Sequence, residues 1–391
     1  MKTRILIALL VSSFALRHSS FAQGSLTPPG APAPTMKSLD QIEARTPISS
    51  AQFTITQPGS YYLTTNLSTS SGDAIDIKTN GVTLDLNGFT ISSTLNPANG
   101  CGIALVGSVS GGVSNITILN GHIQGNVTTN GAGVYSGTGF GYGIGWSNFP
   151  PFRVRISRIS VVGCQYGGIV VSSYDSVIVE SCSVTTIGGK GIVASSVKDS
   201  EALECGGDAI TGVNVTNCRG TCTANSYAIS SETALNCYGR GFVGVYGQAV
   251  LNCYGQTSGS GAGINGTIIQ NSVGESSTGN GGGILGTVAQ NCYGINFGGG
   301  YGVTTTVIAE SCCGICNGSG IGIDTTVAHN CWGRSSSGIG VRCLAGTSGT
   351  GVATACYGES TSYVGINAYI ANGCVGVGPA PISVSYKFNM P

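Results

Sequence analysis

Three charged side chains come nearest in this sequence to a catalytic arrangement. Arg158, Asp175 and Asp199 each stand six or seven residues before a cysteine, and such cysteines recur along the chain. If the recurrence marks the turns of a coil, the arginine and the two carboxylates stack into one patch that could transfer protons or hold calcium. The alternative is a solvated ladder of ion pairs. The alignment depends on Cys205 belonging to the repeat.

A second group of candidates is aromatic. The glycine-rich stretch at 133–155 interrupts the recurrence of the cysteines and places aromatic side chains beside arginines. Aromatic faces accompanied by a few polar groups suit sugar rings, so we expect a ligand to bind here. The alternative is a flap that packs on the body of the protein. The predicted ligand-binding residues are Tyr142, Trp146, Phe149, Arg153 and Arg155.

The 16 cysteines could support redox or metal chemistry. Disulfides are most expected where cysteines crowd together, between Cys218 and Cys222 or between Cys313 and Cys316, because an oxidising compartment permits them. Cys313-x-x-Cys316 is a lone pair with only His329 nearby. A zinc or copper site needs further ligands, so we expect no metal site.

Most cysteines instead follow a period of 16 to 20 residues, within the phrase Asn-Cys-Tyr-Gly and its variants. A Gly-Ile phrase and a Thr-Val phrase recur at the same period, so each repeat holds three short strands. This pattern predicts a parallel β-helix, in which each strand pairs with its copies in the adjacent turns. Because a free cysteine packs as a small apolar side chain, we expect a stacked ladder of mostly reduced thiols. Its members include Cys237, Cys253, Cys292, Cys312 and Cys331.

The segments around this repeat carry signals of their own. Residues 1–22 have the pattern of a secretory signal cut after Ala22, which predicts a secreted or periplasmic protein. A short capping helix is expected at 38–45. The predicted segments are the signal at 1–22, a proline-rich linker at 23–36, an N-terminal cap at 37–54, the β-helix at 55–378 and a C-terminal cap at 379–391.

Composition excludes several classes of protein. The net charge is zero and only 8% of residues are charged, so there is no basic face for nucleic acid. Hydrophobic residues make up 41% of the chain, which is too many for a disordered protein. After the signal no apolar run reaches the roughly 18 residues of a membrane span, so we expect none in the mature chain.

The phrases "GDAIDIKTNGVTLDLNGFTI" and "ITILNGHIQG", followed by the Gly-Ile and Asn-Cys repeats, resemble right-handed parallel β-helix proteins of the pectin-lyase-like superfold and the periplasmic NosD type. The resemblance implies right-handed winding. Polygalacturonase-type members share an aspartate pair, a Gly-His-Gly and an Arg-Ile-Lys, none of which stands here. Pectate-lyase-type members use calcium-bound carboxylates and an arginine base, roles that would fall to Arg158, Asp175 and Asp199. A NosD-like role would involve copper.

The sequence therefore favours a secreted, non-catalytic β-helix protein without a cofactor that binds polysaccharide or a cell-surface glycan. A polysaccharide lyase or glycoside hydrolase is the first alternative, and calcium would be its cofactor if it is a lyase. A NosD-like, metal-related periplasmic protein is the second. The oligomeric state stays open.

Overall fold

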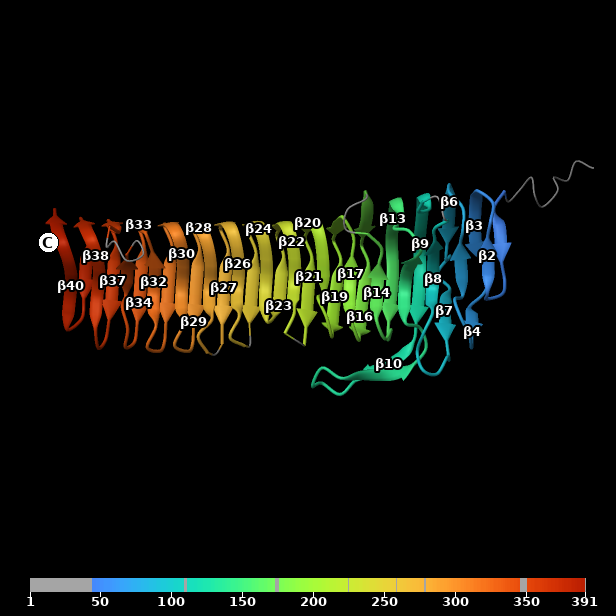
Figure 1. Ribbon diagram of the computed structural model, residues 1–391, viewed down its shortest axis with the longest axis horizontal. Coiled ribbons are helices and arrows are strands. Elements are labelled where there is room, and N and C mark those ends of the chain that lie inside the picture. The colour runs from blue at the N-terminus through green and yellow to red at the C-terminus, as the bar shows by residue number, and fades with distance from the viewer. Residues whose placement is uncertain are drawn as a thin grey trace, which may run out of the picture. The chain divides into compact units, whose positions relative to one another are not determined.

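The computed structural model describes residues 44–390 except 109–110, 173–175, 224, 258, 278 and 345–349. From Thr46 onward the chain forms one unit, a long rod of strands (Figure 1). Within the described part of the chain no residue is helical. The strands pair in parallel with those of the turns before and after, which makes a β-solenoid of about 16 turns. The predicted all-β class and parallel β-helix are confirmed.

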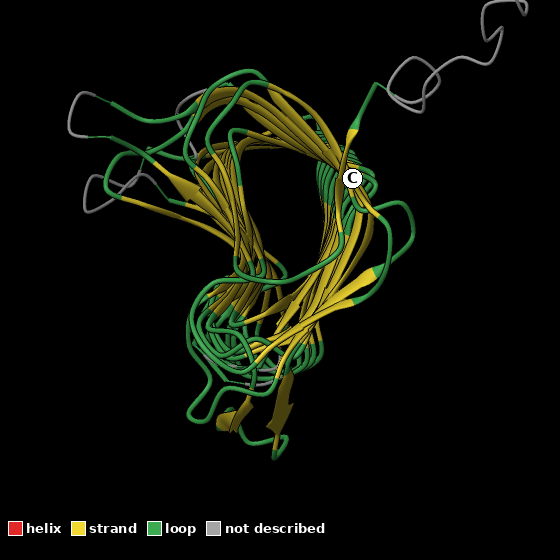
Figure 2. Cartoon of the chain, turned by 90° about the vertical axis from the view of Figure 1, so that its right-hand side faces the viewer, coloured by secondary structure: helices red, strands yellow, loops and turns green. Residues whose placement is uncertain are grey.

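Seen along the rod, the strands line up in walls around the core (Figure 2). The parallel pairings give each turn up to three strands, one in each wall. We call them wall A, which carries the Gly-Ile phrase, wall B, which carries the Thr-Val phrase, and wall C, which carries the Asn-Cys-Tyr-Gly phrase. Strands in wall A are β2 (Phe53–Ile55), β5 (Ile75–Ile77), β8 (Cys101–Val106), β12 (Tyr142–Ser147), β14 (Gly167–Val170), β17 (Lys190–Val193), β32 (Ile321–Thr325) and β35 (Val341–Cys343). Strands in wall B are β1 (Thr46–Ile48), β3 (Gly59–Leu63), β6 (Val82–Asp85), β15 (Val177–Glu180), β18 (Ser196–Lys198), β33 (Val327–His329) and β36 (Val352–Thr354).

Longer strands bend from one wall into the next. Those shared by walls A and B are β20 (Ile210–Thr216), β22 (Tyr227–Leu235), β24 (Val243–Leu251), β26 (Ala262–Gln270), β28 (Gly282–Gln290), β30 (Tyr301–Glu310), β38 (Val364–Asn372) and β40 (Ala380–Phe388). Those shared by walls B and C are β9 (Ser114–Gln124) and β13 (Phe152–Val162).

Wall C holds the remaining short strands of the rod, and a hairpin stands off it. The strands of wall C are β4 (Leu67–Thr69), β7 (Thr90–Ser93), β16 (Ser183–Ile187), β19 (Glu201–Cys205), β21 (Arg219–Cys222), β23 (Tyr238–Gly241), β25 (Tyr254–Thr257), β27 (Val273–Ser276), β29 (Tyr293–Asn296), β31 (Cys313–Cys316), β34 (Trp332–Ser335), β37 (Tyr357–Ser360) and β39 (Val375–Val377). The hairpin pairs β10 (Asn126–Thr129) with β11 (Tyr135–Thr138) in antiparallel fashion and projects below the rod in Figure 1.

The core is a set of stacked aliphatic files. In wall A, Ile264 pairs in register with Ile284, Ile284 with Val303, and Val303 with Ile323. These side chains are fully buried. Every turn therefore adds the same apolar contact to its neighbour, and this contact is what the recurring Gly-Ile phrase encodes.

The glycine of each phrase has a separate cause. Walls A and C converge so closely that a Cβ on Gly302 in wall A would lie 2.4 Å from the backbone nitrogen of Ile315 in wall C. A Cβ on Gly294 in wall C would lie 2.1 Å from the carbonyl oxygen of Gly302. Only a residue without a side chain fits there. Part of the glycine content, 65 of 391 residues, follows from this thin cross-section.

The asparagine of the phrase makes the corner between walls B and C. Asn236 and Asn252 both have a φ of 53°, in the left-handed region that asparagine adopts more readily than most residues. The same corner in other turns is made by Asn87, Asn120, Arg158, Ser181, Asp199, Asn217, Asn271, Asn291, Ser311, Asn330, Ala355 and Gly373, all with positive φ.

The ends of the rod lie beyond the predicted limits of the β-helix. Strand β1 pairs in parallel with β3, and β40 pairs in parallel with β38, so both belong to the ladder. The capping helix expected at 38–45 falls on residues of which the structure describes only the last two. The signal and linker segments also lie outside the described residues.

Candidate functional site

The predicted catalytic patch is only partly visible. Arg158 and Asp199 both stand at the corner between walls B and C, and Asp175 lies outside the described residues. The Arg158 Nε donates a hydrogen bond of 2.6 Å to the Asn120 side chain, while the Asp199 carboxylate accepts one of 2.9 Å from Asn217. Arg158 is thus bonded to the turn before it, and Asp199 to the turn after it.

Arg158 and Asp199 occupy the same corner position two turns apart, although the cysteine expected to align Asp199 is not a member of the periodic file. Cys205 pairs with Ile187 and Cys222, away from the corner, so it lies off the periodic file. In this turn Ser200 occupies the position that a cysteine occupies in most other turns of the file. Its hydroxyl accepts a hydrogen bond of 3.1 Å from the backbone N–H of Cys182. A serine in a cysteine position concealed the true register.

The predicted aromatic site is spread over two walls. Tyr142 and Trp146 lie on β12, where with Val170 they line a small hollow of about 220 Å³. Phe149 follows in the connection, 43% exposed.

The two arginines of that prediction lie on β13 and have other partners. Arg155 forms an ion pair of 2.6 Å with Glu180, and the Arg153 guanidinium lies 5.9 Å from the centre of the Phe152 ring. Neither arginine lines the hollow beside Trp146. Within the stretch at 133–155, β11 belongs to the hairpin that packs on wall C through Tyr135, and β12 and the start of β13 belong to the walls.

The cysteine file is present as a stack of buried thiols. The backbone N–H of Cys237 donates to the Cys253 sulfur at 3.4 Å, and that of Cys356 donates to the Cys374 sulfur at the same distance. Each thiol also donates to the carbonyl oxygen two residues before it, as Cys292 does to Gln290 at 3.2 Å. The buried members are Cys182, Cys218, Cys237, Cys253, Cys292, Cys312, Cys331, Cys356 and Cys374.

All 16 cysteines are free thiols. Cys313 and Cys316 lie three residues apart on one strand, so their side chains point to opposite faces, and no disulfide or shared metal joins them. Cys218 stands in the buried file, whereas Cys222 lies four residues further along the extended chain. Burial raises the pKa of the Cys218 thiol to about 12, which keeps it protonated and inert. Over the part of the chain that the structure describes, no cluster of three or more ligating side chains could hold a metal ion.

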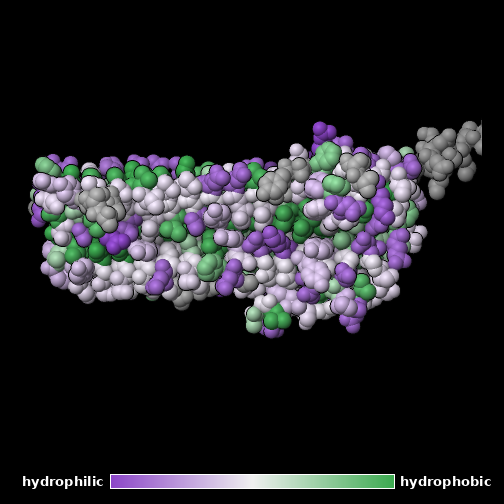
Figure 3. Space-filling view, in the orientation of Figure 1, coloured by the Kyte–Doolittle hydropathy of each residue, from purple (hydrophilic) through white to green (hydrophobic). Residues whose placement is uncertain are grey.

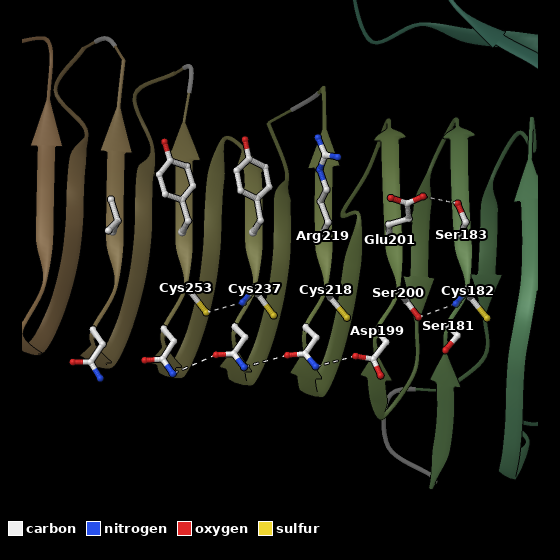
Figure 4. Close-up of a pocket in the computed structure, with 17 residues that line it drawn as sticks. Ser181, Cys182, Ser183, Asp199, Ser200, Glu201, Cys218, Arg219, Cys237 and Cys253 are labelled. Atoms are coloured by element: carbon white, nitrogen blue, oxygen red, sulfur yellow. Dashed lines mark hydrogen bonds between the residues drawn. The ribbon is translucent and has the colours of Figure 1, made fainter.

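Over this file runs an open groove along the corner between walls B and C. Two adjoining hollows of about 980 and 530 Å³ share the turn at Asn271 and together span the corners from Ser181 to Asn330. These are nine successive turns, or about 40 Å at a spacing of about 4.8 Å per turn. Figure 4 shows Cys218, Cys237 and Cys253 side by side along the floor.

One side of the groove is a file of amides. The Asn236 side-chain amide donates to Asn217 at 3.1 Å, Asn252 donates to Asn236 at 3.3 Å, and Asn291 donates to Asn271 at 3.3 Å. Each of these amides donates one N–H to the asparagine of the preceding turn, and its second N–H keeps hydrogen-bonding capacity toward solvent. The row therefore presents donors and acceptors once per turn.

The other side of the groove is formed by the first residue of each wall C strand, which points outward. The Tyr238 and Tyr254 rings stack with centres 5.3 Å apart and planes 2° apart, and the Arg219 guanidinium lies 5.5 Å from the centre of the Tyr238 ring. Burial and a hydrogen bond to Glu275 raise the pKa of the Tyr254 hydroxyl, so it remains a donor at neutral pH. The whole file reads Ser183, Glu201, Arg219, Tyr238, Tyr254, Val273, Tyr293, Cys313, Trp332, Tyr357 and Val375.

The stacked Tyr238 and Tyr254 rings cover each other on one face, whereas smaller residues in the file leave other ring faces uncovered. Val273 separates Tyr254 from Tyr293, and Cys313 separates Tyr293 from Trp332. A ring face bordering such a gap has no aromatic neighbour in the next turn. Across these two gaps Tyr254, Tyr293 and Trp332 each stand two turns from the next, or about 10 Å.

The groove was not predicted from the sequence, although the repeated phrase that forms it was recognised. In the phrase Asn-Cys-Tyr-Gly the cysteine points inward, and the residues on either side of it point outward from two walls that meet at an angle. Figure 3 shows one face of the rod, on which small patches of differing hydropathy alternate.

No family model, no curated protein and no solved structure matches this chain. The described residues contain no helix that is long and apolar enough to cross a membrane. The fold and the groove are therefore the basis for the function proposed below.

Proposed function

We propose that this chain is a non-catalytic β-helix protein that binds a linear polysaccharide along the groove between walls B and C. The observation that carries the proposal is that an asparagine amide on one side faces an aromatic residue on the other in four of the nine turns of the groove, those of Tyr238, Tyr254, Tyr293 and Trp332. Sugars are recognised by aromatic faces together with amide and hydroxyl groups.

The shape of the groove supports a polymer over a small ligand. A small-molecule site is a concave pocket that encloses most of its ligand. The groove is instead open, continuous and about 40 Å long, and its spacing of about 4.8 Å per turn is close to the length of one hexose in an extended chain. Successive sugars can thus meet successive turns.

A second polar file lies on wall B next to the amide file, at the last residues of β26, β28 and β30. The Gln270 side chain donates to Gln290 at 3.0 Å, and Gln290 donates to Glu310 at 2.8 Å. A polymer with many hydroxyl groups would find partners across the width of the groove as well as along it. No specific observation favours a lyase, because Arg158 is hydrogen-bonded to Asn120 and Asp199 to Asn217.

The proposal includes the cellular location of the protein, the handedness of its coil and the relationship of its fold to known folds. The chain is exported to the periplasm or the medium, the coil is right-handed, and the fold is related to the pectin-lyase-like superfold. Export is what would bring the groove into contact with extracellular glycans.

The test measures binding to a panel of neutral and acidic polysaccharides by affinity electrophoresis, with the Tyr254→Ala variant beside the wild type. Tyr246→Ala is the matched control, because Tyr246 is 42% exposed and packs on Tyr227 at 5.2 Å outside the groove. We expect the Tyr254 variant to bind more weakly and the control to bind as the wild type does. Equal retention of all three proteins, or no retention by any polysaccharide, would remove the proposal.

A second arm addresses catalysis. The same polysaccharides are incubated with the protein with and without calcium, and new reducing ends and unsaturated products are measured. We expect neither. Turnover that depends on Arg158 would favour the lyase alternative instead.

A further inference from the structure

The hairpin β10–β11 is fixed above wall C by its aromatic residue. The Tyr135 hydroxyl donates to the carbonyl oxygen of Glu204 at 2.9 Å and lies 3.1 Å from the Thr223 hydroxyl. The Gln165 side chain donates to the Tyr135 carbonyl oxygen at 3.1 Å. Tyr135 also packs with Val127 in a small apolar cluster. The hairpin is thus a built part of this face of the rod.

Beneath the hairpin tip lies a hollow of about 490 Å³ that borders the groove. Gly131 of the hairpin lines one side, and the outward side chains of wall C line the other. Among the latter are Arg219, Thr221 and Arg240. Arg219 also lines the groove, so the hollow and the groove meet at this side chain.

The two arginines are placed to act together. Arg219 pairs in register with Tyr238, and Thr221 pairs with Arg240 one turn on, so the arginines lie on the diagonal of adjacent strands. Side chains on such a diagonal start roughly 7–8 Å apart, which two arginines can span toward one shared group.

Neither arginine has a carboxylate partner within ion-pair distance among the described residues. The nearest acids are engaged elsewhere, because Glu201 accepts a hydrogen bond from Ser183 at 2.9 Å and Glu204 accepts one from Thr186 at 2.9 Å. Figure 4 shows Glu201 turned toward Ser183 and Arg219 extended in another direction. Two guanidinium groups thus face one hollow without a counter-charge bound to them.

We propose that this hollow binds a tetrahedral oxyanion, the chemistry shared by a phosphate and a sulfate group. One guanidinium fork satisfies the two oxygens of a carboxylate, whereas two forks with a threonine hydroxyl match the larger set of oxygens on phosphate or sulfate. The lining charge is positive overall, since Arg219 and Arg240 outweigh Glu204. This site goes beyond the proposed polysaccharide groove and stands without it.

The experiment is calorimetric titration of the full chain with inorganic phosphate, with sulfate and with acetate as the carboxylate probe. The variants are Arg219→Gln, Arg240→Gln and the double variant. Arg334→Gln is the matched control, because Arg334 stands in the same outward file as Arg240, five turns on and away from the hairpin.

We expect phosphate and sulfate to bind more tightly than acetate, and each single variant to weaken that binding by about tenfold or more, as loss of a charged hydrogen bond does. The control should match the wild type. Tyr254→Ala should bind the ions normally, which separates this site from the groove. Equal affinity in the double variant and the wild type would overturn the proposal, and so would acetate binding as tightly as phosphate. A difference between the phosphate and sulfate affinities identifies which of the two sources the site favours.

Discussion

Replacing Ser272 tests whether the cysteine file is held by hydrogen bonds as well as by packing. Ser272 fills a cysteine position, is 1% exposed, and donates to the carbonyl oxygen of Gln270 at 2.7 Å. Its hydroxyl also accepts a hydrogen bond of 3.1 Å from the backbone N–H of Cys253. Ser272→Ala leaves that N–H buried without a partner. Ser272→Cys restores the acceptor, since the Cys253 sulfur does the same for Cys237 at 3.4 Å.

The magnitudes follow from the two partners. An unsatisfied buried donor costs about 1–3 kcal/mol, so the alanine variant should be less stable by that amount. The cysteine variant should lie within about 1 kcal/mol of the wild type, because a thiol is a weaker acceptor but suits the apolar floor.

Hydrogen exchange of the Cys253 amide is the best assay, because solenoids open locally and exchange reports the opening at that one amide. We expect exchange at that amide to quicken about tenfold to a hundredfold in the alanine variant and hardly to change in the cysteine variant. If the two variants exchange alike, the N–H contacts to this file contribute nothing and packing alone holds it.

Two further predictions concern the corner and the thiols. Asn236→Ala places alanine at a φ of 53° and should lower the melting temperature by an amount equivalent to about 1–2 kcal/mol. Asn236→Gly should lower it less, because glycine adopts positive φ without strain. Identical melting temperatures of the two variants would contradict this explanation. Burial raises the pKa of Cys164 and Cys218 from 9.0 to about 12, so the folded state holds these protons more tightly than the unfolded state. The two protonated thiols contribute fully to the stability of the folded state below pH 9, and this contribution falls by about 1.4 kcal/mol per thiol for each pH unit from there toward pH 12. Urea titrations between pH 7 and 11 would show the decrease. Cys164→Ala should make stability depend less steeply on pH.

The fold was predictable because each turn repeats the same physical demands. Inward aliphatic residues, glycine where walls A and C meet and asparagine at the corner recur together, and their common period could be read from the sequence. The turn between Cys182 and Cys218 was harder, because Ser200 fills the cysteine position and Cys205 offers a false one. A hydroxyl and a thiol are interchangeable in hydrogen bonding at this site, yet they look unlike in a search for cysteines.

The candidate sites were less predictable because they depend on how the walls meet. Tyr238 and Asn236 face the same groove because the chain bends at Asn236. The sequence indicates this bend only when Asn236 is recognised as a corner residue. The hollow beneath the hairpin needs a contact between Tyr135 and Glu204, 69 residues apart. No local pattern announces such a contact.

The exceptions to the repeat bear on function more than the repeat itself. A groove whose side chains recur every turn binds a periodic chain equally well after a shift of one turn, so it supplies affinity without fixing a position. Val273 and Cys313 break the aromatic file, and Arg219 ends the run of tyrosines beside the arginine-lined hollow. Only such positions distinguish one turn from the next. A ligand that carries an anionic group within reach of Arg219 would therefore bind in one register, whereas an uncharged polymer would slide among several.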